Sequence, residues 1–172
     1  MFKPFQKAAV LGAGVMGSQI AAHLANVGLI VHLLDIAAKG DNKNDVVETA
    51  FKKAIKQSPP ILFTEKTSSR VILGNFDEHF HRIADVDWVI EVVVENLAIK
   101  QDLMARIEGV ISNDTVVSTN TSGLPVHEIA QGRSESFRKR FLGTHFFNPP
   151  RYLKLLELIP TPDTEPQILE KM

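Results

Sequence analysis

Two ionisable side chains late in the sequence have the surroundings that proton-transfer chemistry requires. His145 stands in the apolar run of residues 141–147, and an imidazole exchanges protons near neutral pH. Glu157 interrupts a second apolar run, residues 155–159. A carboxylate in such a run needs a partner, and a histidine on a neighbouring strand would supply one. The pattern predicts a general base, His145, oriented by Glu157. The alternatives are a hydrogen-bonded core histidine and an edge-strand carboxylate that reaches solvent.

A second chemical feature is the glycine-rich stretch that starts at Gly12. Residues 12–17, GAGVMG, match G-x-G-x-x-G between an apolar run and a segment with helical periodicity. Gly12 would permit a tight turn, Gly14 would let a pyrophosphate approach the backbone, and Gly17 would let the helix pack on the strand. In this context the motif predicts a dinucleotide site, and a glycine-rich turn without a ligand is the alternative.

The start of the helix and the end of the next strand extend this prediction. The first helical turn, which includes Val15 and Met16, would present free backbone N–H groups and the positive end of the helix to the phosphates. Asp35 ends the next apolar run, roughly 20 residues after the glycines, where a ribose-binding carboxylate belongs. A carboxylate there disfavours a 2′-phosphate, so the sequence indicates NAD rather than NADP.

The segments that would position these residues alternate between strand and helix. Short apolar runs predict strands, and a period of 3.6 residues predicts helices. The strands are expected at 8–11, 30–35, 71–73, 88–94, 115–118, 141–147 and 153–159, and the helices near 15–27, 45–57, 95–110 and 166–172. The alternation predicts an α/β fold, a Rossmann-type doubly wound and mostly parallel sheet. The long connection after the second strand predicts an inserted helical hairpin over residues 45–70 that protrudes from the domain.

Polar residues at the ends of these strands are the ones expected to meet a ligand. In a doubly wound sheet, ligands bind outside the carboxyl ends of the strands. In chain order, the polar residues at these ends are Glu91, Glu95, Asn96, Asn120, Thr121, Ser122, His145 and Asn148. A random placement of polar residues would not gather them at one edge, so we expect a single site there.

Composition narrows the possible functions. The 172 residues carry a net charge of −1, which gives no reason to expect a nucleic acid or an anionic membrane as partner. The chain has no cysteine, so disulfides and thiolate catalysis are excluded. No apolar run reaches transmembrane length and no signal peptide is evident, so we expect a cytoplasmic protein. His79 and His81 lack an evident third ligand, so no metal site is predicted.

Five parts of the sequence are distinctive when they are taken together. They are VLGAGVMGSQIAAHLANVG (10–28), Asp35, VIEVVVENLAIKQDL (89–103), STNTSGLPVHEIA (118–130) and FLGTHFFNPPRYLKLLELIP (141–160). In these parts the chain resembles the NAD-binding domain of the L-3-hydroxyacyl-CoA dehydrogenase family. The match spans nearly the whole chain, and its last two motifs are far more specific than the glycine motif.

The resemblance implies a reaction and three catalytic residues. His145 resembles the family's catalytic base, Glu157 the carboxylate paired with it, and Ser122 the serine that hydrogen-bonds the reacting oxygen. The implied reaction is the reversible NAD-dependent oxidation of L-3-hydroxyacyl-CoA to 3-ketoacyl-CoA in fatty-acid β-oxidation. His145 would remove the proton of the 3-hydroxyl as C3 passes a hydride to the nicotinamide.

The resemblance also implies how the ligands are held. Glu95 and Lys100 match positions near the nicotinamide ribose, and Asp35 matches the carboxylate of the adenosine ribose. Asn120, after the fifth strand, is expected to contact the same cofactor. The acyl-CoA substrate would reach the inserted hairpin of residues 45–70.

Two substitutions and the length separate this chain from the family pattern. Gly123 stands where relatives often carry a second serine, and Gln19 where a glycine is common. The family's helical C-terminal domain, which completes the acyl pocket and builds the dimer, is absent. We therefore expect residues 1–172 to be the NAD-binding domain alone and to turn over poorly. The parent protein would be a homodimer or a multifunctional protein with an enoyl-CoA hydratase part.

Two other functions are compatible with parts of this pattern. One is another β-hydroxyacid dehydrogenase with the same glycine motif, but those enzymes typically use a lysine base and lack the HFFNP pattern of residues 145–149. The other is a sensor module for NAD or CoA that kept the fold and lost the chemistry. His145, Glu157 and Ser122 argue against a sensor, since it has no need of all three.

Overall fold

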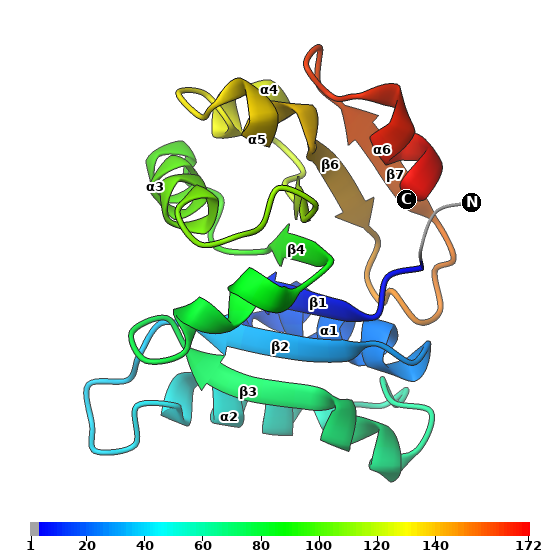
Figure 1. The fold of residues 1–172 in the computed structure, drawn as a ribbon. Helices are drawn as coiled ribbons and strands as arrows, with labels where there is room; N and C mark the ends of the chain where they lie inside the picture. The colour runs from blue at the N-terminus through cyan, green and yellow to red at the C-terminus, as the bar shows by residue number, and fades with distance from the viewer. Residues whose placement is uncertain (1–3) are drawn as a thin grey trace.

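The computed structural model describes residues 4–172 as one seven-stranded sheet with helices packed on it (Figure 1). The elements are β1 (Lys7–Leu11), α1 (Val15–Asn26), β2 (Ile30–Asp35), α2 (Asp45–Ile55), η1 (Glu65–Arg70), β3 (Val71–Asn75), η2 (Phe80–Asp85), β4 (Trp88–Glu91), α3 (Leu97–Glu108), β5 (Val116–Thr119), α4 (Val126–Ile129), α5 (Glu135–Lys139), β6 (Phe141–Phe146), β7 (Leu156–Pro160) and α6 (Pro166–Lys171), where η marks a 3-10 helix. The strand order is β3-β2-β1-β4-β5-β6-β7, and only the pair β6–β7 is antiparallel. The predicted doubly wound, mostly parallel α/β sheet is confirmed.

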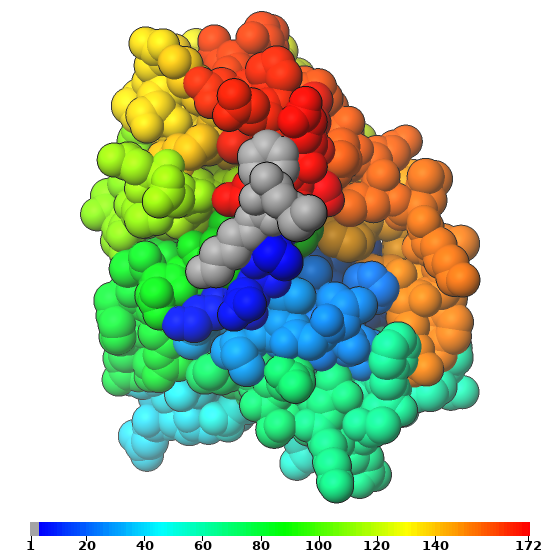
Figure 2. Space-filling model, turned by 45° about the vertical axis from the view of Figure 1, so that its right-hand side comes forward, coloured from blue at the N-terminus to red at the C-terminus, as the bar shows by residue number. Residues whose placement is uncertain are grey.

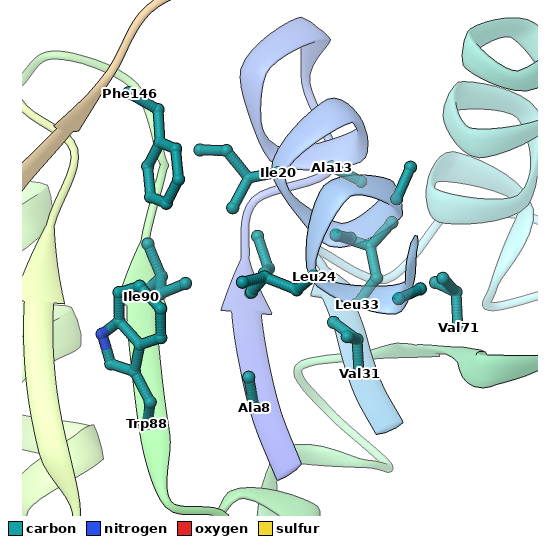
Figure 3. Close-up of a cluster of buried hydrophobic side chains, with 14 of the residues drawn as sticks. Ala8, Ala13, Ile20, Leu24, Val31, Leu33, Val71, Trp88, Ile90 and Phe146 are labelled. Atoms are coloured by element: carbon teal, nitrogen blue, oxygen red, sulfur yellow. The ribbon is translucent and has the colours of Figure 1, made fainter. Parts of the chain in front are cut away.

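Alternating side chains of the strands fill a hydrophobic core on each face of the sheet. In β1, Ala8 and Val10 join the cluster beneath α1 and α2, whereas Ala9 and Leu11 join the cluster beneath α3 and η2. Figure 3 shows the first cluster, where side chains of β1, β2 and β4 meet those of α1. Because both faces are covered, the strands are nearly continuous apolar runs, which is why the sequence pattern predicted them so directly.

The segment between β2 and β3 differs from the protruding hairpin that the sequence predicted. It contains one α-helix, α2, and the short 3-10 helix η1. The buried side chains of α2, Val47, Phe51 and Ala54, belong to the first hydrophobic cluster, and α2 packs against α1, β2 and β3. The helix therefore covers the sheet, because its apolar face is buried there and not in solvent.

Residues 60–63, between α2 and η1, are tied to two distant parts of the chain. The side-chain amide of Asn26 in α1 makes two hydrogen bonds of 2.8 Å to their backbone. Arg151 donates to two of their carbonyls at 2.6 Å each, and the Tyr152 hydroxyl donates to one of them at 2.8 Å. These hydrogen bonds hold the turn that carries Arg151 against residues 60–63. β7 therefore begins at Leu156, later than the predicted start at residue 153.

β4 ends at Glu91, earlier than the predicted end at residue 94. Glu91 pairs with Leu11, the last residue of β1, and with Thr119, the last residue of β5. Beyond this line neither neighbour continues as a strand, so the apolar residues 92–94 form the connection to α3. The carboxyl ends of three adjacent strands therefore coincide.

The two ends of the described chain lie close together. Lys171 in α6 places its ammonium nitrogen 5.1 Å from the ring centroid of Phe5. Figure 2 shows the red C-terminal helix beside the blue N-terminal segment. The first three residues of the predicted domain lie outside the described range. Within residues 4–172, no helix has both the length and the apolar character needed to cross a membrane.

Candidate functional site

The glycine turn between β1 and α1 is closely packed at two of its three glycines. Gly12 has a φ of +107°, and a Cβ there would lie 2.6 Å from the carbonyl oxygen of Val92. A Cβ on Gly17 would lie 1.8 Å from the carbonyl oxygen of Gly12. No atom described lies within 4 Å of the corresponding position at Gly14. Gly12 and Gly17 are thus required by the fold itself, whereas Gly14 borders open space of the kind a phosphate could occupy.

The N-terminal end of α1 faces this open space. Gly14 is the N-cap, and within residues 4–172 no side chain caps the helix and no acid lies in its first turn. Val15 is exposed and Met16 is partly buried. The backbone N–H groups and the positive end of the helix are therefore available to an anion, as the sequence predicted.

Asp35 lies at the end of β2, directly against the glycine turn. Its Oδ2 accepts a hydrogen bond from the Ala13 N–H at 2.6 Å, and its Oδ1 accepts one from the Ile36 N–H at 2.7 Å. The carboxylate is partly buried, so it holds the turn in place and still borders solvent. Together with the free space at Gly14 and the uncapped helix, this arrangement fits a dinucleotide. The residues that would hold it are Gly12, Gly14, Val15, Met16, Gly17 and Asp35.

Glu95, in the connection between β4 and α3, binds the loop that carries Ser122. Its Oε1 accepts the Thr121 hydroxyl and the backbone N–H groups of Ser122 at 3.2 Å and Gly123 at 3.1 Å. Burial alone would raise the pKa of the Glu95 carboxyl, but these hydrogen bonds and the Lys100 ammonium outweigh it and lower the pKa to about 2. Glu95 is therefore a carboxylate at neutral pH, and it holds Ser122 through the backbone.

Lys100 is buried below this loop and does not reach the surface. Its side chain is 1% exposed, and its Nζ lies 2.7 Å from Oε1 of Glu91 and 3.3 Å from Oε2 of Glu95. It also donates to the Val93 carbonyl at 3.2 Å. The resemblance implied that Lys100 lies near the nicotinamide ribose. In the structure its ammonium is buried, and the exposed side chain that it contacts is Glu95.

Asn120, predicted to contact the cofactor, joins two strand ends. Its Oδ1 accepts the Phe146 N–H at 2.9 Å, and its own N–H donates to the Glu91 carbonyl at 2.8 Å. Its side-chain oxygen is therefore occupied by a hydrogen bond from the backbone at the end of β6. Its amide group remains for a ligand, and contact with the cofactor stays a prediction.

His145 and Glu157 face each other across the antiparallel pair β6–β7. They are direct partners in the register, and Nδ1 of His145 lies 2.8 Å from Oε2 of Glu157. β5 pairs with β6 only as far as Gly143, so His145 stands on the part of β6 that extends past β5. The Phe147 ring packs on the imidazole with centroids 4.7 Å apart. The predicted pairing is present, and it leaves Nε2 of His145 for another partner.

Most of these positions could be predicted from the sequence, but Glu91, which was expected to meet a ligand, is part of the buried interior instead. Glu91 is fully buried, and its carboxylate binds Lys100, the Val93 N–H and the Thr119 hydroxyl. The signal was present, because an acid ended an apolar strand and a lysine followed on the next helix. His79 accepts a hydrogen bond from the Asn75 N–H at 3.1 Å through Nδ1, and residues 4–172 contain no group of three side chains placed to hold a metal.

Gly14 and Gly17 should respond differently to replacement by alanine. We expect Gly14→Ala to keep the free energy of unfolding within about 0.5 kcal/mol of wild type, because its Cβ meets nothing. The same change should weaken NADH binding by more than about tenfold, or 1.4 kcal/mol, since the methyl enters the space of the phosphates. Gly17→Ala should cost roughly 1–3 kcal/mol of stability or prevent folding.

Urea unfolding and NADH fluorescence titration measure the two quantities. Gly109→Ala is the control, because its Cβ would meet only ordinary contacts at the end of α3. Unchanged NADH affinity in folded Gly14→Ala would contradict this assignment of the phosphate site.

Comparisons with known proteins agree with this geometry. Residues 7–172 match the family described as 3-hydroxyacyl-CoA dehydrogenase, NAD binding domain. A probable 3-hydroxyacyl-CoA dehydrogenase of Bacillus subtilis is 46% identical over 187 residues, which cover 100% of this chain and 24% of the relative. A putative fatty acid oxidation complex trifunctional enzyme of Rickettsia felis is 40% identical over 173 residues, with 100% and 24% covered.

A solved structure supports the same relationship. The 3-hydroxybutyryl-CoA dehydrogenase of Escherichia coli K12 superposes with a TM-score of 0.77 at 31% identity, over 98% of this chain and 35% of the other. The chain spans about a quarter of the length of the two curated relatives. By the match over residues 7–172, the chain belongs to the NAD-binding domain family of the 3-hydroxyacyl-CoA dehydrogenases, and its cofactor is NAD.

Proposed function

We propose that the protein containing this chain oxidises L-3-hydroxyacyl-CoA to 3-ketoacyl-CoA with NAD as the hydride acceptor, in fatty-acid β-oxidation. The observation that carries the proposal is the pair His145–Glu157, 2.8 Å apart at the edge of the sheet that also holds the glycine turn. A nucleotide-binding fold alone would not need a histidine paired with a carboxylate there. The names of the relatives support the same substrate class.

The proposed base is His145. With Nδ1 bonded to Glu157, Nε2 is free to accept the proton of the 3-hydroxyl, and the Glu157 carboxylate stabilises the imidazolium that forms. NAD, when bound, supplies the acceptor for the hydride from C3. The Ser122 hydroxyl has no hydrogen-bond partner among residues 4–172, so in the proposal it donates to the reacting oxygen.

We also propose that residues 1–172 supply only part of this active site. The chain spans about a quarter of the length of the Bacillus subtilis and Rickettsia felis relatives, and the latter is named a putative trifunctional enzyme of fatty acid oxidation. In the proposal, a helical second domain completes the acyl pocket, and the CoA part of the substrate lies near the inserted segment of residues 45–70. The parent protein is a homodimer or carries an enoyl-CoA hydratase part.

Replacing the base should separate catalysis from cofactor binding. We expect His145→Gln in the full-length protein to lower kcat by about 10²–10⁴, because proton transfer is lost while the glycine turn is untouched. Glu157→Gln should lower it less, since it removes only the charge that orients and stabilises the imidazole. Oxidation of 3-hydroxybutyryl-CoA measures turnover, and NADH fluorescence measures binding.

His127→Gln is the matched control, because His127 is an exposed histidine on α4 that makes no hydrogen bond or ion pair with either residue. An active His145→Gln protein would refute the proposed base. A wild-type protein that binds NAD and oxidises no hydroxyacyl thioester would favour the sensor module instead.

The isolated chain should bind NADH but oxidise it slowly with acetoacetyl-CoA. The reason is that the proposed second domain contributes the rest of the acyl pocket. The assay compares the rate for the 172 residues with the rate for the full-length protein at equal concentration. Equal rates in the two would show that this chain carries the whole site.

A further inference from the structure

A pair of opposite charges is buried beneath the site, and the proposed chemistry does not use it. The side chains of Glu91 and Lys100 are 0% and 1% exposed, and Oε1 and Nζ lie 2.7 Å apart. Removing two charges from water costs free energy, and apolar side chains of similar volume are often as stable or more stable in their place. Packing alone therefore does not explain why the charges are there.

Glu91 is held from three directions. Beside Lys100, its Oε1 accepts the Val93 N–H at 2.7 Å, and its Oε2 accepts the Thr119 hydroxyl at 2.6 Å. Thr119 ends β5, and Lys100 lies on α3. The Glu91 carboxylate thus connects the ends of β4 and β5 with α3. These buried contacts fix its position.

Lys100 links Glu91 to Glu95 at the site. Its ammonium lies 3.3 Å from Oε2 of Glu95, a side chain that is 41% exposed. The other oxygen of Glu95 accepts the backbone N–H groups of Ser122 and Gly123. The contacts therefore run without a gap from buried Glu91, through Lys100 and Glu95, to the backbone of the residue with the free hydroxyl.

We propose that Glu91 is a positioning residue for the reaction: through Lys100 it holds Glu95, and Glu95 holds the backbone that aims the Ser122 hydroxyl. Glu91 itself touches neither substrate nor cofactor, because it is fully buried. The inference rests on the proposed function for the meaning of Ser122, but the mechanical link can be measured without any activity.

The expected effect of breaking the chain follows from the charges. Without Glu91, Lys100 keeps Glu95 as its one carboxylate partner among the described residues. The ammonium is then free to draw Glu95 inward, and removing both charges leaves Oε2 of Glu95 without the ammonium; either change loosens residues 122–123. Misplacement of a reacting group by about 1 Å costs up to about 10²-fold in rate.

The test uses a variant that removes both charges, Glu91→Gln/Lys100→Met, so that no unpaired buried charge unfolds the protein. The matched control is Glu108→Gln/Arg133→Met, which removes the ion pair, with N and O 3.1 Å apart, between Arg133 and Glu108, the last residue of α3. In the full-length protein we expect the first variant to lose about 10-fold to 100-fold in kcat. The control should keep its kcat.

A second comparison separates positioning from general damage. In a Ser122→Ala background, Glu91→Gln/Lys100→Met should lower kcat by less than about threefold, because the hydroxyl it positions is already gone. The same large loss with and without Ser122 would overturn the proposal. So would a folded double variant with wild-type kcat.

Amide hydrogen exchange tests the link in this chain whether or not it is active. Protection of the Ser122 and Gly123 N–H groups should fall by more than about tenfold in Glu91→Gln/Lys100→Met and stay unchanged in the control. Unchanged protection in both would overturn the inference. Loss of protection together with an inactive wild-type enzyme would keep the mechanical link and refute the proposed function instead.

Discussion

The strands β1, β4 and β5 end at the same level of the sheet, and the rest of the structure depends on this constraint. Leu11, Glu91 and Thr119 lie side by side in register, so the segments that follow all leave the sheet at one edge. One of these segments is the glycine turn, another leads to Glu95, and the third carries Ser122. Parallel strands make this convergence unavoidable, and it explains why residues far apart in the sequence share one site.

Two kinds of packing hold that edge together. At the glycine turn the backbone of Gly12 fits between Gly17 and Val92 so closely that no side chain can be added to either glycine. Beside it, the buried carboxylate of Glu91 satisfies one ammonium, one backbone N–H and one hydroxyl. The first contact sets the distance between helix and sheet, and the second ties the sheet to α3. Both fix backbone positions before any ligand binds.

The sheet and the His145–Glu157 pair could be predicted because their signals are local. Strands buried on both faces are apolar runs, and an ionisable residue that interrupts such a run is conspicuous. The end of β4 could not be predicted, because residues 92–94 are as apolar as the strand and only the ends of its neighbours stop it. Lys100 follows a helical pattern that does not reveal its burial, which depends on Glu91 in the tertiary structure. The short helices α4 and α5 have too few residues to show a period.

We propose that this fold brings a proton acceptor and a hydride acceptor to one secondary alcohol. The most direct measurement is the fate of deuterium placed on C3 of L-3-hydroxybutyryl-CoA, followed by mass spectrometry of the nucleotide after reaction with NAD and the full-length protein. We expect NADH that carries the deuterium on its nicotinamide ring, formed at a rate that falls sharply when His145 is replaced by glutamine. Bound NAD that stays oxidised, or NADH without deuterium, would contradict it.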